Sequence, residues 1–401
     1  MFSTGLSAGN SGAEAASAAL DEALENLEGP PKLAFVYASS GFDYDSVLGA
    51  VSKRLGEVPL VGCSTAGQFT QSGVGTKSVS VALMSTSEID VSTAMATGLG
   101  DGKEAAVRSL ARALPDVPEG SSVTALLFAD GLSGAGEELT VMAARMFEKF
   151  AGVPVRLAGG FAGDDLLFRR TEVFCGNVHA SDAAAVCFLV SPFPMFTSVS
   201  HGHRPLSDRM KVTSSRGNVV REVDGESAWK VWRRETEAHL DRLGHVDLED
   251  PAVLPRLILG NFELGLATDS DGMYKIRFPM SVADDGSLVF ACAIPEGSVF
   301  RIMDGCNVHE QIAASRRAAE EAVTSARAQG YESFSCAMVF ECGIRLALLR
   351  DEFIRSIEAY RSVLPETPII GWETYGEIRM EPGGYSGFHN TTTVMLLVPK
   401  G

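Results

Sequence analysis

The amino-acid sequence predicts an α/β fold of two domains, built from repeated strand-helix-strand-strand units around mixed β-sheets. Three stretches, which begin near residues 33, 123 and 336, each place an apolar run before an amphipathic run and follow it with two further apolar runs. In each stretch the second apolar run ends among glycines and other small residues. Repeated units in one chain usually share a core, so the equivalent turns are expected to line one site. The alternative is that three common strand-turn patterns resemble one another by accident.

The first unit predicts a strand over Leu33–Ala38, a helix over Tyr44–Leu55, a strand from Leu60 and a closing strand over Val79–Met84. The segment from Gly62 to Gly67 is interpreted as a turn. Glycine tolerates positive φ and has no Cβ, so the backbone N–H groups of such a turn are free to face a ligand.

The other two units repeat this order. The second predicts strand Ala125–Phe128, helix Glu137–Phe150, a strand ending at Leu157, a turn over 158–163 and strand Ala183–Val190. The third predicts strand Cys336–Phe340, a turn over Glu341–Arg345, helix Leu346–Val363, strand Ile369–Ile370, a turn over 371–377 and strand Thr391–Val398.

The length of 401 residues and the 45% apolar content indicate two or more domains with full cores. We expect a leader helix within residues 1–29, an N-terminal domain over 30–225 and a C-terminal domain over 226–398, the last opening with a helix over Glu226–Leu243. The stretch Leu257–Phe300 alternates short strands and turns, as antiparallel hairpins do.

The net charge of −17 argues against nucleic-acid and membrane partners, because both require a basic surface. The seven cysteines form no Cys-x-x-Cys pair, and no apolar stretch reaches the roughly 18 residues of a membrane span. We therefore expect reduced core thiols and a cytoplasmic protein.

The glycine turns and the polar residues near them are the candidate ligand-binding residues. They are Gly62, Cys63, Ser64, Thr65, Gly67, Asp130, Gly159, Gly160, Asp164, Arg204, Arg345, Thr374, Glu377, His389 and Asn390. A bulky residue at Gly62 or Gly160 is expected to abolish ligand binding and spare the fold. Glu341, Arg345, Glu373 and Glu377 sit in apolar or glycine-rich motifs, so they either pair with one another, as Arg345 with Glu377, or meet a polar ligand.

Catalytic and metal motifs are weak. The GCSTA segment lacks the second glycine of a nucleophile elbow, no phosphate loop is complete, and neither histidines nor cysteines show zinc spacing. A hydrolase-like enzyme using Cys63 or Asp164 remains a third hypothesis. His201 and His203 share a face if they lie on one strand, and they are the candidates for ligating haem iron. The alternative places one in solvent and the other in a core.

The chain resembles the FIST family, the F-box and intracellular signal transduction proteins. The matching segments are VGCSTAG (61–67), FADGLSG (128–134), AGGFAGDD (158–165), GHRPL (202–206), VTSSRGNVVREVDG (212–225), DGSLVFACAIPEG (285–297), FECGIR (340–345), GWETYGEIR (371–379) and FHNTTTVMLL (388–397). The resemblance assigns 30–225 to a FIST N-terminal domain and 226–398 to a FIST C-terminal domain.

This resemblance implies a non-catalytic sensory protein for signal transduction that binds a small ligand, such as an amino acid, and relays its presence to a partner. It also implies an alternative, a haem-binding nitric oxide sensor that regulates a histidine kinase. No cofactor other than haem is suggested.

Overall fold

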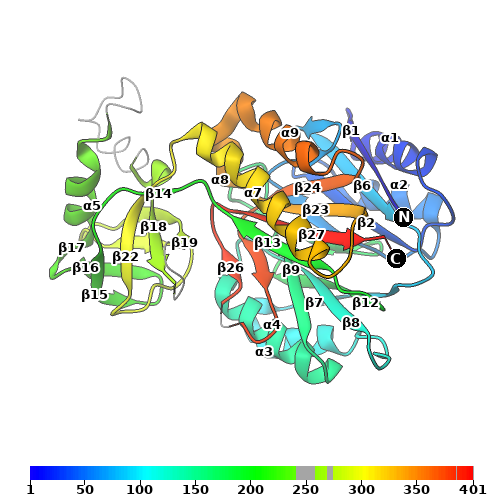
Figure 1. The fold of residues 1–401 in the computed structure, drawn as a ribbon, viewed down its shortest axis with the longest axis horizontal. Helices are drawn as coiled ribbons and strands as arrows, with labels where there is room; N and C mark the ends of the chain where they lie inside the picture. Colours follow the sequence, from blue (N-terminus) through cyan, green and yellow to red (C-terminus); the bar gives the residue numbers. More distant parts are fainter. Residues whose placement is uncertain (241–257, 269–273, 385, 401) are drawn as a thin grey trace.

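The computed structural model describes residues 1–240, 258–268, 274–384 and 386–400. Figure 1 shows a large α/β body that holds both termini and a smaller, β-rich lobe beside it. We call these parts the body and the insert lobe. The mixed α/β class predicted from the sequence is confirmed.

The body consists of three copies of one unit, and each copy is longer than the pattern predicted. The first copy comprises β1 (Phe2–Ala8), α1 (Gly12–Glu25), β2 (Leu33–Ser39), α2 (Tyr44–Leu55), β3 (Leu60–Thr65), the hairpin β4 (Gln68–Thr70) and β5 (Gly73–Gly75), and β6 (Ser78–Met84). The first 29 residues therefore hold a strand as well as the predicted helix. Strand β1 pairs with β6, so this segment is part of the first sheet.

The second copy follows the same order. It comprises β7 (Asp90–Thr97), α3 (Leu99–Ala111), β8 (Ser122–Ala129), α4 (Gly136–Ala151), β9 (Val155–Phe161), the hairpin β10 (Val173–Cys175) and β11 (Val178–Ala180), and β12 (Ala183–Ser191).

The third copy is interrupted by the insert lobe after its first strand. It comprises β13 (Phe196–Ser200), then α7 (Val308–Arg327), β23 (Phe334–Cys342), α8 (Gly343–Leu349), the 3-10 helix η2 (Arg350–Phe353), α9 (Ile354–Val363), β24 (Ile369–Thr374), the hairpin β25 (Glu377–Met380) and β26 (Phe388–His389), and β27 (Thr393–Pro399). The predicted turn over Glu341–Arg345 is wrong, because β23 continues to Cys342 and α8 begins at once. The single predicted helix over Leu346–Val363 is broken where Arg350 takes a left-handed φ of 49°.

The insert lobe consists of the described residues 204–240, 258–268 and 274–304. It comprises β14 (Arg204–Pro205), β15 (Met210–Arg216), β16 (Val219–Val223), β17 (Glu226–Ser227), α5 (Ala228–Glu237), β18 (Phe262–Ala267), β19 (Tyr274–Arg277), β20 (Pro279–Val282), β21 (Leu288–Phe290) and β22 (Val299–Asp304). Its strands pair antiparallel, which confirms the hairpins predicted for Leu257–Phe300. Strand β15 pairs with β22, so strands from both sides of residue 226 share one sheet. The predicted end of the helix at Leu243 lies outside the described residues.

The three body sheets have equivalent strand orders. They run β1-β6-β2-β3-β10-β11, β7-β12-β8-β9-β25-β26 and β13-β27-β23-β24-β4-β5. In each sheet the central pair is parallel, and its neighbours are antiparallel. The hairpin of each unit crosses to another sheet: β4 joins β24, β10 joins β3 and β25 joins β9. This cyclic exchange links the three units into one body.

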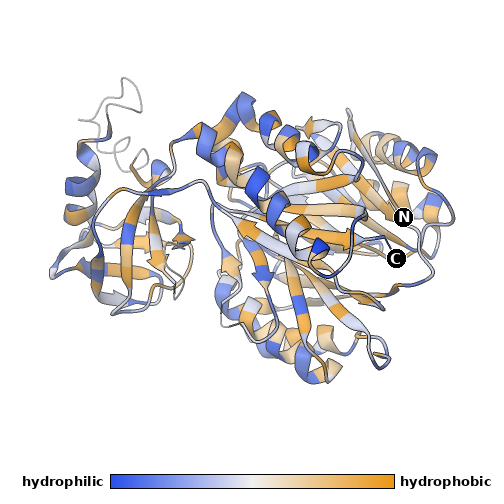
Figure 2. Cartoon of the chain, in the orientation of Figure 1, coloured by the Kyte–Doolittle hydropathy of each residue, from blue (hydrophilic) through white to orange (hydrophobic). Residues whose placement is uncertain are grey.

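Side chains of the central strands alternate between two cores. Leu33, Phe35 and Tyr37 of β2 face a core shared by all three sheets, whereas Ala34 and Val36 face helices α1 and α2. The other two units alternate in the same way, with α3 and α4 or α7 and α9 outside. Figure 2 shows the strands of the body as largely apolar. Sheets buried on both faces explain the continuous apolar runs of the sequence.

Glycine occupies the same position in each parallel pair. Gly62 lies opposite Val36, Gly159 opposite Leu127 and Gly371 opposite Val339. A Cβ on Gly62 would lie 1.8 Å from the Val36 carbonyl oxygen, and one on Gly371 would lie 2.1 Å from the Phe69 ring. The interpretation of these glycines as turn residues is therefore wrong: they lie inside strands, where a neighbour occupies the space of a side chain.

We predict that Gly62→Ala destabilises the protein by about 3 kcal/mol or more, because the β2 backbone would have to move. The expectation that a larger residue here spares the fold is thus withdrawn. Gly49→Ala is the matched control: Gly49 lies inside α2 with nothing within 4 Å of an added Cβ, so alanine should stabilise by up to about 1 kcal/mol. Urea unfolding of both variants measures the difference, and equal effects would contradict the packing argument.

Candidate functional site

A pocket of about 670 Å³ lies between the body and the insert lobe. We call it the interlobe pocket. The residues that line it from the body are Gly131, Leu132, Gly134, Ala135, Gly136, Phe161, Leu166, Phe168, Cys342, Ile344, Thr374, Tyr375, Phe388 and Asn390. From the insert lobe come Asn218, Phe278, Met280, Phe290, Ala291, Cys292 and Ala293. The volume is typical of sites that enclose a small molecule.

The first body wall is the loop between β8 and α4, which Asp130 holds in place. The Asp130 carboxylate accepts hydrogen bonds from the Leu132 N–H at 2.9 Å, the Asp182 N–H at 2.5 Å and the Thr171 hydroxyl. Because the Asp130 carboxylate already accepts three hydrogen bonds from the protein, its role is to hold the loop in place. The loop residues that line the pocket are glycines and Leu132.

The second wall is the loop after β9, which depends on Asp164. Its carboxylate accepts from the backbone N–H groups of Phe168 at 2.8 Å, Arg169 at 2.6 Å and Arg170 at 2.8 Å, and from the Tyr375 hydroxyl. Asp165, Leu166 and Phe168 all have positive φ. Such strain persists only where surrounding bonds impose it. Asp164 thereby displays Leu166 and Phe168 to the pocket.

The third wall is the turn after β24, behind which Glu377 is fully buried. The Thr374 hydroxyl donates to Glu377 Oε1 at 2.8 Å, and the Thr392 N–H and hydroxyl donate to Oε2 at 3.0 and 2.7 Å. Burial raises the pKa of Glu377 to about 8 despite these three bonds. Glu377 is therefore mostly neutral near pH 7 and positions Thr374.

An ionic cluster ties the insert lobe to the body beside the pocket. Glu137 of α4 lies 2.7 Å from Arg277 and 3.5 Å from Lys275, both on β19. Arg277 also donates to the Phe388 carbonyl at 2.8 Å, and the Gly387 N–H donates to Glu137 at 3.1 Å. Although burial acts to raise it, Lys275 and Arg277 hold the pKa of Glu137 below its ordinary value. We call this cluster the latch.

The paired histidines lie at the connection between the two parts, and neither lines the interlobe pocket. His203 is buried with Nε2 3.3 Å from Glu263 Oε1, and the His201 ring lies 5.6 Å from the His203 ring. Burial, with the neighbouring His203, lowers the pKa of His201 to about 3. The two imidazoles do not jointly face this pocket.

The predicted Arg345–Glu377 ion pair is wrong. Arg345 Nε lies 2.7 Å from Glu341 Oε1, and its other nitrogens donate to Gln311 and Ser315 of α7. Glu341 lies near the end of β23 and Arg345 in the first turn of α8, so the strand-to-helix junction brings the two side chains together. Glu373 is buried without a hydrogen-bond partner for either carboxyl oxygen, and burial followed by the nearby Glu341 raises its pKa well above the ordinary value.

Of the predicted site residues, Thr374 and Asn390 line the interlobe pocket. Asp130, Asp164 and Glu377 hydrogen-bond to lining residues, and the partly buried His389 ring contacts the Arg379 carbonyl. Gly62, Cys63, Ser64, Thr65, Gly159 and Gly160 lie buried in β3 and β9, Gly67 in the turn after β3, and Arg204 pairs with Glu310 on the surface at 2.5 Å. Burial raises the pKa of the Cys63 thiol well above its ordinary value.

Sequence reasoning missed the aromatic residues of the pocket. The predicted ligand-binding residues include none of the six aromatic lining residues, which are Phe161, Phe168, Phe278, Phe290, Tyr375 and Phe388. Several are adjacent to the motifs that carried the family resemblance, such as FACA and FHN, and this adjacency is the signal that would have found them.

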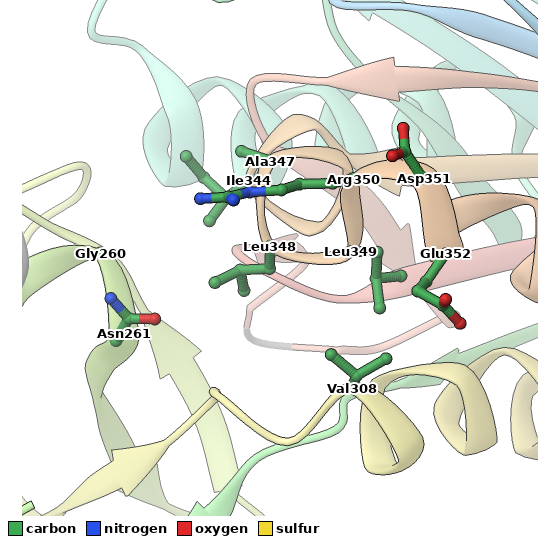
Figure 3. A pocket seen from close by; sticks show the side chains of 10 residues that line it. All are labelled: Gly260, Asn261, Val308, Ile344, Ala347, Leu348, Leu349, Arg350, Asp351 and Glu352. Atoms are coloured by element: carbon green, nitrogen blue, oxygen red, sulfur yellow. The ribbon is translucent and has the colours of Figure 1, made fainter. Parts of the chain in front are cut away.

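A second, open hollow of about 550 Å³ lies beside α8. Figure 3 shows it between Gly260 and Asn261 of the insert lobe, Val308 of α7, and the segment Ile344–Glu352. Ile344 lines both this hollow and the interlobe pocket. The start of α8 thus borders two hollows at the junction of the parts.

Within the described ranges, no group of three or more His, Cys, Asp or Glu side chains is arranged to hold a metal ion. No helix among those same residues combines the length and apolar character needed to cross a membrane. None of the seven cysteines forms a disulfide bond.

Comparison with known protein families matches residues 32–226 to the FIST N domain and residues 235–380 to the FIST C domain. No curated protein matches the chain. Among solved structures, a cyanuric acid hydrolase from A. caulinodans aligns over 100% of this chain and 99% of its own, with 10% identity and a TM-score of 0.32.

We predict that Glu377→Gln flattens the pH dependence of stability. Unfolded, this carboxyl ionises near 4.5, whereas the folded pKa is about 8. The folded state therefore holds the extra proton across that range, and its stability declines as pH rises from 4.5 to 8. Glutamine removes this contribution, which amounts to about 1.4 kcal/mol per pH unit.

Denaturant unfolding at several pH values tests this prediction. Glu358→Gln, on the exposed face of α9, is the control and should leave the slope unchanged. A Glu377→Gln variant with the wild-type slope would contradict a neutral, buried Glu377.

Proposed function

The chain belongs to the FIST family, and from this premise we propose that it is a sensory protein that binds a small molecule in the interlobe pocket and reports it to a partner protein. The observation that carries the proposal is that the walls of this pocket come from both the body and the insert lobe. A ligand that touches both parts has a different affinity for each of their arrangements, and binding therefore shifts the population between them.

The connection between the parts suits such a change. The chain enters the insert lobe through residues 201–203 and leaves through residues 305–307, and the strands beyond these segments pair, Arg204 opposite Asp304. Two adjacent segments form a narrow joint, while the latch supplies a second contact across the pocket. Ligand binding in the pocket and the contacts of the latch would thus both affect how the insert lobe lies relative to the body.

The rim of the pocket is unusually apolar for a surface. Leu132 and Phe168 of the body are 39% and 49% exposed, and Met280 of the insert lobe is 54% exposed. Closure of the insert lobe over a ligand would remove these side chains from water, at about 25 cal/mol per Å² of buried apolar area. This burial supports a closed, ligand-bound state.

The output of this sensor is proposed to be a contact with a signalling partner such as a histidine kinase, in the cytoplasm. Ligand binding is coupled to partner binding if the partner has a different affinity for the open and the closed arrangement. Haem and hydrolase chemistry have less support: His201 and His203 lie away from the interlobe pocket, Cys63 is in the core, and Asp164 accepts four hydrogen bonds.

We predict that Ala293→Phe abolishes ligand binding, because Ala293 lines the pocket at an exposed position on its rim, where the added ring narrows the opening. Metabolites that raise the melting temperature of the wild-type chain should no longer do so in this variant. Ala105→Phe on the exposed side of α3 is the control. Equal thermal shifts in wild type and Ala293→Phe would remove the pocket from the mechanism.

We also predict that Glu137→Gln loosens the two parts. Without the carboxylate charge, Lys275 and Arg277 are left without their acidic partner, at a cost of about 2 kcal/mol. Hydrogen exchange should quicken in peptides covering 274–277 and 386–388. Glu138→Gln, whose ion pair with Lys103 at 3.0 Å stays within the body, is the control. Unchanged exchange in Glu137→Gln would show that the latch does not hold the insert lobe.

A further inference from the structure

Among the residues that the structure describes, no charged side chain lines the interlobe pocket. None of its described lining residues is Asp, Glu, Lys, Arg or His, whereas six of them are aromatic: Phe161, Phe168, Phe278, Phe290, Tyr375 and Phe388. This composition argues against a charged ligand, because a buried charge needs an opposite charge in contact with it. We infer that the natural ligand is an uncharged molecule with an aromatic ring, and not a zwitterion such as a free amino acid. The inference rests on the proposed function, since it assumes that this pocket is the sensory site.

The charged groups nearest to the pocket are already engaged. The Asp164 carboxylate accepts four hydrogen bonds, one of them from Tyr375, so the Tyr375 hydroxyl points to Asp164. Glu137 is taken up by Arg277, Lys275 and the Gly387 N–H. A ligand ammonium would therefore find no available carboxylate on the wall.

A carboxylate on the ligand has little more to bind. Thr374 gives its hydroxyl proton to Glu377, and the Asn390 amide donates to the His389 carbonyl at 3.1 Å. Lys275 and Arg277 both contact Glu137 and do not line the pocket. Burial of both charges of an amino acid here would cost much of its binding free energy.

The ring arrangement favours a planar, aromatic ligand. Phe168 stacks on Tyr375 with 4.6 Å between ring centroids, and Phe388 meets Phe161 edge to face at 5.2 Å. An aromatic ring of a ligand could add to either pair, and its stacking and edge-to-face contacts would contribute binding free energy beyond that of its buried area. Asn218 and Asn390 each donate one amide proton to a backbone carbonyl, of Phe290 at 2.8 Å and of His389 at 3.1 Å, and the second amide proton of each suits a neutral ligand oxygen but does not compensate a buried charge.

The test uses the full-length chain and the neutral fluorophore N-phenyl-1-naphthylamine, whose emission rises in an apolar site. Two competitors share a benzyl group: L-phenylalanine, a zwitterion, and 3-phenylpropanamide, which is uncharged. We expect 3-phenylpropanamide to displace the fluorophore at a concentration about a hundredfold or more below that needed for L-phenylalanine.

Variants assign the signal to the pocket. Phe168→Asn removes the ring but suits the positive φ of 53°, and it should weaken fluorophore binding about tenfold. Phe150→Asn, at a residue that is 42% exposed on α4 and outside the pocket, should leave binding unchanged.

The outcomes distinguish a wrong ligand class from a wrong sensory site. Displacement by L-phenylalanine at equal or lower concentration, with sensitivity to Phe168→Asn, would overturn the ligand class and leave the pocket as the sensory site. Fluorophore binding that is absent, or equal in wild type, Phe168→Asn and Ala293→Phe, would overturn both the ligand class and the proposed site.

Discussion

Close packing at the middle of each parallel strand pair is the constraint on which the body depends. At Gly62, Gly159 and Gly371 the exchanged strand of another unit brings a large apolar residue to the paired position: Phe174, Ile378 and Phe69 respectively. A side chain on any of these glycines would meet the neighbouring backbone or the Phe69 ring. At Gly371 the excluding contact is the exchanged Phe69 ring itself, whereas at Gly62 and Gly159 it is the backbone of the neighbouring parallel strand.

The three units also meet in one aromatic centre. Tyr37, Phe128 and Phe340 hold equivalent positions, opposite Cys63, Gly160 and Trp372 in their parallel pairs. The Trp372 ring stacks on Tyr37 at 5.5 Å and on Phe128 at 6.1 Å, and Gly160 leaves it room. One large residue thus fills a space to which three units contribute, and the centre of the body is a packed core.

The proposed functional site lies where the three units differ from one another. The insert lobe interrupts the third unit alone, and it faces the strand ends of the second and third units. Asp130, Asp164 and Glu377, which look like ligand-binding groups in a linear sequence, hold the loops at these strand ends. Because their oxygens are used in this way, the surface they present is apolar, and the latch at Glu137 is the charged contact beside it.

The sequence by itself determined the three units, the bounds of α2 at Tyr44–Leu55 and the antiparallel character of the region before Phe300, because apolar periodicity and helix-ending residues are local signals. Only the tertiary structure decided what the glycines and carboxylates do. The local sequence around a glycine in an apolar run does not show whether the glycine ends a strand or makes room for a side chain such as Phe69. In the same way, the sequence around Asp164 does not show whether its carboxylate binds a ligand or four donors of its own chain. The partners of these residues lie up to hundreds of positions away, as Glu377 pairs with Gly160 and Arg277 with Glu137, and no local pattern encodes such pairings.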